Sequence, residues 1–478
     1  MLDPLHVLWT SWFGSPDFTP WLVGAWLVYV LGLGLWIVLQ KREPVATLSW
    51  LILLAALPYV GFLVYFVFGP QRIERQRLRR GRARERMPAA RPGHSPGVEA
   101  LELGRLGQAT TGHAPGSATS VQLLSGGEAK FTALLEAIAT ARSHVHIEYY
   151  IYKPDGIGTA LRDALIERAR AGLDVRLLLD AVGSNRLTRT FLAPLTEAGA
   201  RVAWFHPLRI HWFWRRPWLN LRTHRKIVVI DGEVAFTGGI NISDEQDARA
   251  CTQAYHDLHM RLTGEVVDAL ELVFIEDWAY ATGEPPLALP PSTCTPGPLA
   301  AQVLVSGPDS PWEAIHRMKV GAIHAARTRV WLATPYFVPG EAAMMALTSA
   351  ALGGLDVRLI VPKLCDSRLV TWATRSYFDE LLEAGARIYE YGPPMLHTKA
   401  LLCDDDVAVI GSANFDHRSF RLNFEVSVLF CDRAVAAQLA DVLEHDCARA
   451  SQVARTRERP LLGSRLPEAL ARLVSPLL

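Results

Sequence analysis

The chain opens with two long stretches that carry no charged side chain, at 21–39 and 45–68. Each is long enough for a helix rising 1.5 Å per residue to cross a hydrocarbon core about 30 Å thick. The short segment Lys41-Arg42-Glu43-Pro44 separates them, so the two helices would form a tight hairpin. A cleaved signal peptide fits poorly because no Lys or Arg precedes the first stretch, and a buried soluble hairpin would be unusually apolar. We therefore expect residues 1–70 to form a transmembrane hairpin.

A cluster of arginines follows the second stretch and predicts the orientation of the hairpin. Eight arginines lie between Arg72 and Arg86, whereas the loop of the hairpin holds only Lys41 and Arg42. Basic residues favour the cytoplasmic side, so everything after the hairpin is expected there. The cluster would also attract anionic headgroups. Residues 71–119 are expected to be this basic segment followed by a flexible linker rich in Pro, Gly and Ala.

From about residue 120 the hydrophobic pattern alternates between helical and extended periods. The expected elements are a helix at 131–142, a strand at 145–152, a helix at 158–171 and a strand at 175–179, then a helix at 312–326 and strands at 329–337 and 357–361. The strands at 175–179 and 357–361 are continuously apolar, as strands buried on both faces are. Alternation of this kind predicts an α/β sandwich.

The alternating region is an internal duplication. The segment VRLLLD at 175–180 corresponds to VRLIVP at 357–362, and EAGARVAWF at 197–205 corresponds to EAGARIYEY at 383–391. The proline-rich segment 282–298 is the expected junction between the copies. The sequence therefore predicts a first domain at 120–285, a second at 300–450 and a tail at 451–478.

Each copy contains the pattern H-x-K-x4-D-x6-G-[GS]-x-N. The first occurrence is THRKIVVIDGEVAFTGGIN at 223–241 and the second is LHTKALLCDDDVAVIGSAN at 396–414. The members discussed below are His224, Lys226, Asp231, Gly239 and Asn241, and then His397, Lys399, Asp404, Ser412 and Asn414. Two complete matches at corresponding places in a duplicated unit point to function rather than to surface charge on two hairpins.

The spacing suits phosphate chemistry. His and Lys at positions i and i+2 of a strand project from the same face. We expect Gly239 and Ser412 to let backbone N–H groups approach a phosphate, and Asn241 and Asn414 to add amide donors. Each copy supplies a single motif histidine, so a nucleophile and an acid require both copies around one active site.

Carboxylates beyond the motif histidines are candidates for orienting the imidazole rings. We expect Asp257 to serve the first copy and Glu425 the second, although ordinary salt bridges within the fold are an equally good interpretation. Asp231 and Asp404 lie five positions beyond the lysines. They are expected to hold the hairpins, by ion pairing, rather than to touch phosphate.

Composition adds little to this picture. The net charge is +1, so overall electrostatics favours neither nucleic acid nor acidic substrates. No His, Asp or Glu cluster has an obvious metal-ligand spacing, and the six cysteines are scattered as reduced thiols would be. The aromatic and basic segment 204–220 either docks on a lipid interface or packs over the sheet, and residues 459–478 fit a short amphipathic helix.

The paired pattern is the signature of the phospholipase D superfamily, and the chain resembles its bacterial cardiolipin synthases. Further segments carry this resemblance: HIEYYIYKPDGIG at 146–158, NLRTHRKIVVIDG at 220–232, FIEDWAYATGE at 274–284 and TPYFVP at 334–339. It implies two phospholipase D-like domains sharing one active site, no metal or other cofactor, and a place in the bacterial inner membrane.

The resemblance also implies the reaction: two phosphatidylglycerol molecules give cardiolipin and glycerol through a phosphatidyl-histidine intermediate. His224 is favoured as the nucleophile and His397 as the acid, with the reverse assignment open. A hydrolytic phospholipase D, or a synthase with another phospholipid donor or acceptor, is the main alternative. A nuclease is disfavoured by the absence of an extended basic face, and a membrane scaffold by the two intact motifs.

Overall fold

The computed structural model describes residues 18–39, 47–48, 50–52, 54, 98–207, 221–288, 294–310 and 312–475. The chain divides into two compact units, one holding the N-terminal residues to Gln71 and the other nearly all of the rest. In the N-terminal unit, the first apolar stretch forms helix α2 (Phe18–Leu39). Ile37 of α2 packs with Leu54 of the second stretch. Within the described residues, no helix has both the length and the apolar character needed to cross a membrane.

Most of the second expected span lies outside the described residues, as does the arginine cluster. The transmembrane hairpin at 1–70 therefore stays a prediction.

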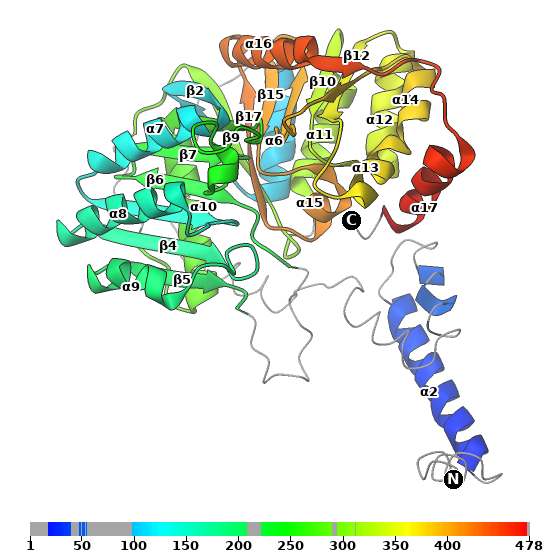
Figure 1. Cartoon of the computed structure of the whole chain (residues 1–478), viewed down its shortest axis with the longest axis horizontal. Coiled ribbons are helices and arrows are strands. Elements are labelled where there is room, and N and C mark those ends of the chain that lie inside the picture. Colours follow the sequence, from blue (N-terminus) through cyan, green and yellow to red (C-terminus); the bar gives the residue numbers. More distant parts are fainter. Residues whose placement is uncertain are drawn as a thin grey trace. The chain divides into compact units, whose positions relative to one another are not determined.

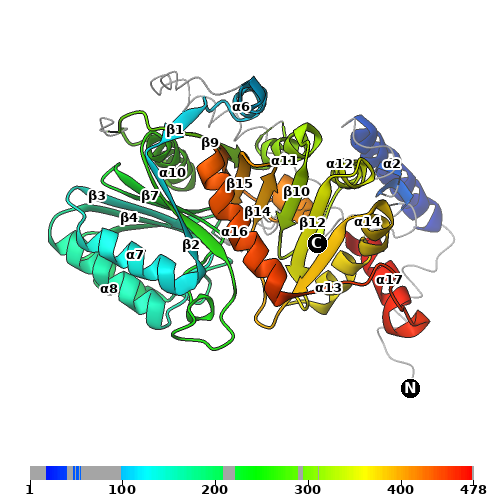
Figure 2. The same cartoon turned by 90° about the horizontal axis from the view of Figure 1, so that it is seen from above.

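The first copy forms a seven-stranded sheet in the larger unit. The strand order is β2 (Ser120–Ser125), β8 (Leu258–Thr263), β7 (Val234–Gly238), β6 (Lys226–Ile230), β3 (His144–Tyr149), β4 (Asp174–Asp180) and β5 (Arg201–Phe205). Helices α7 (Gly126–Ala139), α8 (Gly156–Arg170) and α9 (Arg189–Glu197) pack on one face, and α10 (Val266–Thr282) packs on the other (Figure 2). The inner strands are buried on both faces, which explains their nearly continuous apolar sequences.

The second copy forms a nine-stranded sheet beside the first (Figure 1). Its order is β1 (Gly116–Ala118), β9 (Leu299–Ser306), β17 (Glu425–Cys431), β15 (Val407–Gly411), β14 (Ala400–Cys403), β10 (Arg329–Ala333), β12 (Asp356–Pro362), β13 (Arg387–Tyr391) and β18 (Ala450–Gln452). Its helices are α11 (Ala314–Ala325), α12 (Glu341–Leu352), α13 (Arg368–Arg375), α14 (Phe378–Ala384), α15 (His417–Arg421) and α16 (Arg433–Arg449). A short pair, β11 (Phe337–Val338) and β16 (Phe415–Asp416), completes the described strands.

One hydrophobic core is shared by the two copies. It combines side chains from both sheets with those of α10 and α16, so these two helices occupy a central layer. Each sheet has a further core on its outer face, under α7 to α9 in the first copy and under α11 to α14 in the second. The burial of apolar surface between the copies holds the two sheets in a fixed relation, and the cleft described below depends on this relation.

The duplication is confirmed by the register of the strands. In the first copy, His144 of β3 pairs with Asp174 of parallel strand β4, and in the second, Arg329 of β10 pairs with Asp356 of parallel strand β12. The backbone N–H of Asp231 donates to His144, as that of Asp404 donates to Arg329. The predicted helices and strands of both copies are present, but the helix expected at 131–142 begins at Gly126, and the strand expected at 329–337 ends at Ala333, before the separate short strand Phe337–Val338.

The expected flexible linker is wrong for its second half. Residues 98–111 form helix α6 (Val98–Thr111), and β1 then extends the nine-stranded sheet by pairing with β9. Leu103 is buried in the outer core of the second copy, and the Gln302 amide donates to the backbone carbonyl of Gly104. The abundance of Gly and Ala here reflects close packing instead: a Cβ on Gly107 would come within 2.2 Å of the Gln302 side chain.

The C-terminal tail packs on the second copy. After the turn η3 (Leu461–Arg465), helix α17 (Leu466–Val474) lies against α13 and buries Glu468 and Ala471. Arg457 forms an ion pair with Glu468, which connects the segment before η3 to helix α17. The expected short amphipathic helix is thus present, with several leucines left exposed on its outer side. No disulfide joins any of the six cysteines, all of which lie in the described ranges.

Candidate active site

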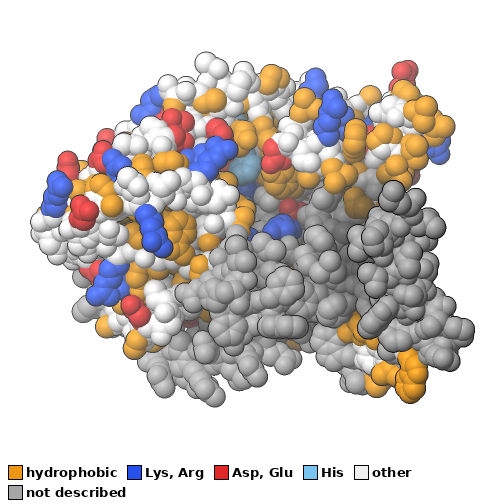
Figure 3. Space-filling model, turned by 60° about the horizontal axis from the view of Figure 1, so that its bottom comes forward, with side chains coloured by type: hydrophobic (Ala, Val, Ile, Leu, Met, Phe, Trp, Pro, Cys, Tyr) orange, Lys and Arg blue, Asp and Glu red, His pale blue; other side chains and the backbone are white. Residues whose placement is uncertain are grey.

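Both motif histidines line one cleft between the two copies. The cleft has a volume of about 510 Å³, and its walls include His224 and Asn241 from the first copy and His397 and Asn414 from the second. Figure 3 shows the hollow, with histidine side chains (pale blue) visible in it. The two occurrences of the sequence pattern are therefore brought together in space.

Each motif histidine is held by the backbone of the opposite copy. The N–H of His224 donates to the carbonyl of Phe424 over 2.8 Å, and the N–H of His397 donates to the carbonyl of His256 over 2.7 Å. Isolated parallel bridges accompany these bonds, between Thr223 and Phe424 and between His256 and Leu396. The position of each imidazole is thus fixed only when both copies are present.

The orienting carboxylates are exchanged between the copies, which corrects the expected pairing. Nδ1 of His224 lies 3.0 Å from Glu425, and Nδ1 of His397 lies 2.6 Å from Asp257. We expected Asp257 to serve His224 and Glu425 to serve His397. Both carboxylates stand at the start of, or just before, a strand beside the interface, so each reaches across it. Both are completely buried.

The two lysines lie below the histidines in the protein interior. Lys226 Nζ donates to the His224 carbonyl over 2.7 Å, and Lys399 Nζ contacts His397 Nδ1 at 2.8 Å and Asp257 at 3.4 Å. Burial lowers the pKa of Lys226 to about 7, partly opposed by Glu425, and burial also lowers the pKa of Lys399. An anion in the cleft would raise the pKa values of both lysines and so favour their charged forms.

Burial also controls the protonation of the histidines. It lowers the pKa of His224 to about 4 and also lowers that of His397, with nearby lysines adding to the effect and the carboxylates opposing it. The carboxyl of Asp257 shows the opposite balance. Burial tends to raise its pKa, but Lys399 and His397 lower that pKa to about 2. Before a phosphodiester binds, both imidazoles are therefore neutral at pH 7 while their carboxylate partners are charged.

The expected role of Gly239 and Ser412 in phosphate binding is wrong. Their backbone N–H groups donate to the carbonyls of Leu258 and Val426, at 2.9 and 2.8 Å, so neither is directed at the cleft. The Ser412 hydroxyl donates to Glu425. A Cβ on Gly239 would come within 2.1 Å of Asp257, which explains why glycine stands there. These residues support the carboxylates that orient the imidazoles.

Asn241 and Asn414 do lie at the cleft. The side-chain oxygen of Asn241 accepts a weak bond from the backbone N–H of Ile151, which turns its amide nitrogen outward. The side-chain oxygen of Asn414 is buried and has no hydrogen-bond partner among the described residues. Both asparagines remain candidates for phosphate contact.

Asp231 and Asp404 hold their hairpins through backbone bonds instead of ion pairs. Each has a positive φ, 57° and 51°, and ends a strand of the motif. Asp231 accepts from the N–H groups of three consecutive residues at 142–144 over 2.7–3.0 Å. Asp404 does the same for residues 327–329. Neither lines the cleft, so the expectation that they do not touch phosphate stands as a prediction.

The residue between His224 and Lys226 ties the motif to α10. Arg225 points away from the cleft, forms a buried ion pair with Asp277 of α10, and donates to the carbonyl of Glu425. The side chain of Arg225 thus connects α10 to the strand that carries the carboxylate partner of His224.

Several cleft residues lie outside the sequence motif. Tyr150 meets the His224 ring edge-on at 5.0 Å between centroids, and Tyr255 lies 5.6 Å from the His397 ring. Tyr336 donates to Asp366 at the mouth, and Arg418 adds a cation to the lining. Tyr150 and Tyr336 fall in segments that carry the family resemblance, which was the only signal for them in the sequence.

The aromatic segment at 204–220 is described only at its start. Phe205 is fully buried and packs with Tyr280 and Phe424, which favours packing for that residue. Residues 208–220, where most of the tryptophans lie, are outside the described residues.

Comparisons with known proteins agree with this geometry. Residues 134–278 and 320–447 match the family described as cardiolipin synthase, PLD-like domain, and residues 30–70 match the phospholipase D-nuclease N-terminal family. The chain is 39% identical to the cardiolipin synthase of Geobacillus kaustophilus (strain HTA426), over 94% of this chain and 92% of that protein. It is 36% identical to the cardiolipin synthase of Alkalihalophilus pseudofirmus, over 96% and 95% of the two chains.

A solved structure shares the fold. The crystal structure of phosphatidylserine synthase from Haemophilus influenzae Rd KW20 superposes with a TM-score of 0.60 at 16% identity, covering 79% of this chain and all of that one. The duplicated α/β fold, the paired cleft histidines and the relatives matched over nearly the whole length lead to one conclusion: the chain belongs to the phospholipase D-like cardiolipin synthase family.

Proposed function

We propose that the protein is a cardiolipin synthase that transfers the phosphatidyl group of one phosphatidylglycerol to another, releasing glycerol. The observation that carries this proposal is the pair of histidines in one cleft, each bonded through Nδ1 to a buried carboxylate. That bond leaves each Nε2 available for chemistry on a phosphodiester, as in other His–carboxylate pairs. The names of the relatives supply the lipid product, cardiolipin.

The first step would be attack of His224 Nε2 on phosphorus. A P–N bond forms while the bond from phosphorus to the headgroup glycerol oxygen breaks, and His397 as imidazolium gives its proton to that oxygen. Lys226 and Lys399 would offset the charge on the phosphoryl oxygens from behind, with Asn241 and Asn414 as amide donors.

The second step would use the same groups in reverse. The free hydroxyl of a second phosphatidylglycerol loses its proton to neutral His397 while its oxygen attacks phosphorus, and the P–N bond to His224 breaks. Cardiolipin leaves and both imidazoles return to their starting state. No metal enters either step.

Membrane attachment would favour lipid over water as the acceptor. An N-terminal hairpin spanning the bacterial inner membrane twice would hold the cleft at the bilayer surface, where phosphatidylglycerol is concentrated. The match of residues 30–70 to an N-terminal family of phospholipase D-type proteins supports this part of the proposal. The catalytic unit would then face the cytoplasm.

The test is an incubation of the purified full chain with phosphatidylglycerol labelled in its headgroup. We expect cardiolipin and free glycerol in equal amounts, and no turnover in His224→Asn or His397→Asn. The main alternative is a hydrolytic phospholipase D, which would release phosphatidic acid. Phosphatidic acid as the main product would contradict the proposal. Adding phosphatidylethanolamine as a competing donor would reveal a different headgroup preference.

A further inference from the structure

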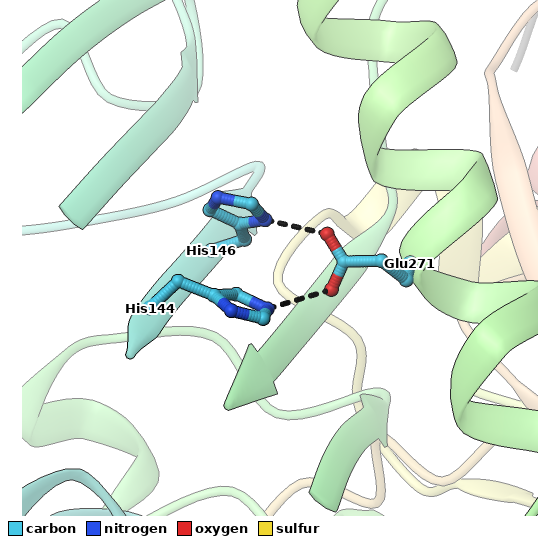
Figure 4. A group of neighbouring side chains, drawn as sticks. All are labelled: His144, His146 and Glu271. Carbon is cyan, nitrogen blue, oxygen red and sulfur yellow. Dashed lines mark hydrogen bonds and ion pairs between the residues drawn. The ribbon is translucent and has the colours of Figure 1, made fainter. Parts of the chain in front are cut away.

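A second cluster of histidines lies at the end of β3 away from the cleft. His144 and His146 project from alternate positions of β3 toward Glu271 of α10 (Figure 4). His144 Nε2 is 3.4 Å from one carboxylate oxygen, and His146 Nδ1 is 2.5 Å from the other. The three ligand atoms lie within 4.8 Å of one another. We propose that His144, His146 and Glu271 bind a divalent metal ion of the zinc type, which clamps α10 to the first sheet.

The hydrogen bonds of His144 argue for a cation. Its Nδ1 lies 3.1 Å from the hydroxyl oxygen of Ser143, and that hydroxyl donates its proton to Asp231 over 2.9 Å. When the hydroxyl donates to Asp231, the Ser143 oxygen accepts from Nδ1–H, and a neutral ring then directs the lone pair of Nε2 at the Glu271 carboxylate. Two acceptors face each other in that state, and either a metal ion or a second ring proton between them resolves the conflict.

His146 has the arrangement typical of a metal ligand. While Nδ1 faces Glu271, Nε2 on the other side of the ring lies 3.9 Å from Asp174 and forms no hydrogen bond with any residue that the structure describes. Metal-bound histidines commonly direct their second nitrogen at a carboxylate or another polar group, which orients the ring. Both histidines of the cluster therefore have such a partner: Ser143 for His144 and Asp174 for His146.

The donor set indicates the kind of metal. Two imidazole nitrogens and one carboxylate oxygen form a common zinc set, with a fourth position left for water. The site is closed, because His144, His146 and Glu271 are only 7%, 4% and 2% exposed. A buried site of this kind suits a structural ion better than a catalytic one.

The second copy shows that the fold itself does not require these histidines. By register, Arg329 stands where the first copy has His144, and Trp331 stands where it has His146. There the Trp331 ring lies between the guanidinium groups of Arg329 and Arg358, at 4.6 and 3.9 Å, and its indole N–H donates to Asp356. The same place is filled without any ligand set, so the His/His/Glu cluster is a specific feature of the first copy.

The site would act on the catalytic unit through α10. This helix carries Glu271 at the cluster and Asp277 at the ion pair with Arg225. A metal ion that joins Glu271 to β3 would therefore restrict the motion of α10, the helix whose Asp277 pairs with Arg225 of the first motif. The inference rests on the cluster alone and does not depend on the proposed reaction.

The test measures metal in the purified full chain, after removal of any affinity tag. We expect about one zinc ion per chain, removed by a strong chelator and restored by Zn²⁺ with a rise in the thermal unfolding midpoint. Glu271→Gln and His146→Asn should lose the ion and the rise. His144→Arg, which introduces the residue of the second copy, provides a further ligand variant should either of these fail to fold.

His316→Asn is the matched control, because His316 also contacts a glutamate, Glu313 at 2.9 Å, but belongs to no group of three possible metal ligands in the described chain. It should keep the ion. If the wild-type chain takes up no Zn²⁺ and its unfolding midpoint does not move, the cluster is held by protons and the inference is overturned. Equal zinc content in the wild type and in the three ligand variants would also overturn it, by placing the ion elsewhere.

Discussion

At the scale of single residues, each motif histidine is oriented by a carboxylate from the other copy, and this pairing determines which carboxylate would support the nucleophile and which the acid. Glu425 contacts His224 and Asp257 contacts His397, although the chain order suggested the opposite. The sequence predicted all four residues because they belong to two recognisable segments. It could not predict the pairing, because the direction in which a carboxylate reaches across an interface depends on how the two sheets are placed.

This pairing predicts different defects for two conservative substitutions. Glu425→Gln should impair mainly formation of the phosphatidyl-histidine, since it misorients the nucleophile, and Asp257→Asn should also slow breakdown of that intermediate, since His397 must take the proton of the acceptor hydroxyl in the second step. We expect each to lower kcat by about 10- to 1000-fold with a small change in KM. Rapid-quench kinetics separates the two steps. The opposite assignment of defects would restore the pairing expected from chain order.

Binding of a phosphodiester should be accompanied by proton uptake. Burial and Lys399 keep the pKa of His397 below its ordinary value in the free enzyme. An anion bound beside the imidazole would raise that pKa. Because the complex then binds more protons than the free enzyme, affinity should fall as pH rises above the pKa of free His397. Calorimetry with a short-chain phosphodiester, in buffers of different ionisation enthalpy, measures the uptake. An affinity that does not change with pH between about 5 and 8 would contradict the expected proton uptake.

At the scale of elements, the turn after each motif strand supports a carboxylate. Gly239→Ser would introduce a Cβ against Asp257, so activity should fall by at least about 100-fold. Ser412→Gly introduces no clash and removes only the hydroxyl bonds to Glu425 and to the backbone of Val426, so it should cost about 10-fold or less. Steady-state assays of the two variants, with circular dichroism as a check of folding, test this asymmetry. Similar losses in both variants would indicate direct phosphate contact by the turns.

The aspartates that end the motif strands are predicted to matter for stability more than for chemistry. Asp231→Asn keeps a residue that tolerates the positive φ but weakens the acceptor of three backbone N–H groups, so we expect a loss of about 1–3 kcal/mol in unfolding free energy. Urea unfolding measures the loss, and kcat per folded molecule should change little. A stable variant that forms no covalent intermediate would instead place Asp231 in the reaction.

Helices and strands were predicted well where apolar residues recur with a regular spacing, and poorly where they do not. The alternating helices and strands of both copies followed from apolar spacing and from the repeat. Helix α6 and strand β1 were missed, because a segment rich in Gly and Ala has the composition of a linker and gains its structure only by packing against β9. The His144 and His146 pair was likewise passed over, since its third partner, Glu271, lies on a distant helix.

At the scale of the whole molecule, the two copies form one catalytic unit that neither could form alone. The shared core, the crossed backbone bonds and the exchanged carboxylates all lie at the interface between them. The chemistry of phosphate transfer follows from this interface. The proposed lipid substrate, by contrast, is inferred from family membership and from the two N-terminal apolar stretches. Most of the second stretch lies outside the described residues.

The most direct test of this account is to locate the covalent intermediate. Full-length enzyme is mixed with phosphatidylglycerol, quenched at alkaline pH, digested and analysed by mass spectrometry. The account predicts a phosphatidyl group on His224, present in Asp257→Asn and strongly reduced in Glu425→Gln. A phosphatidyl group on His397, or turnover to cardiolipin with no histidine adduct, would contradict it.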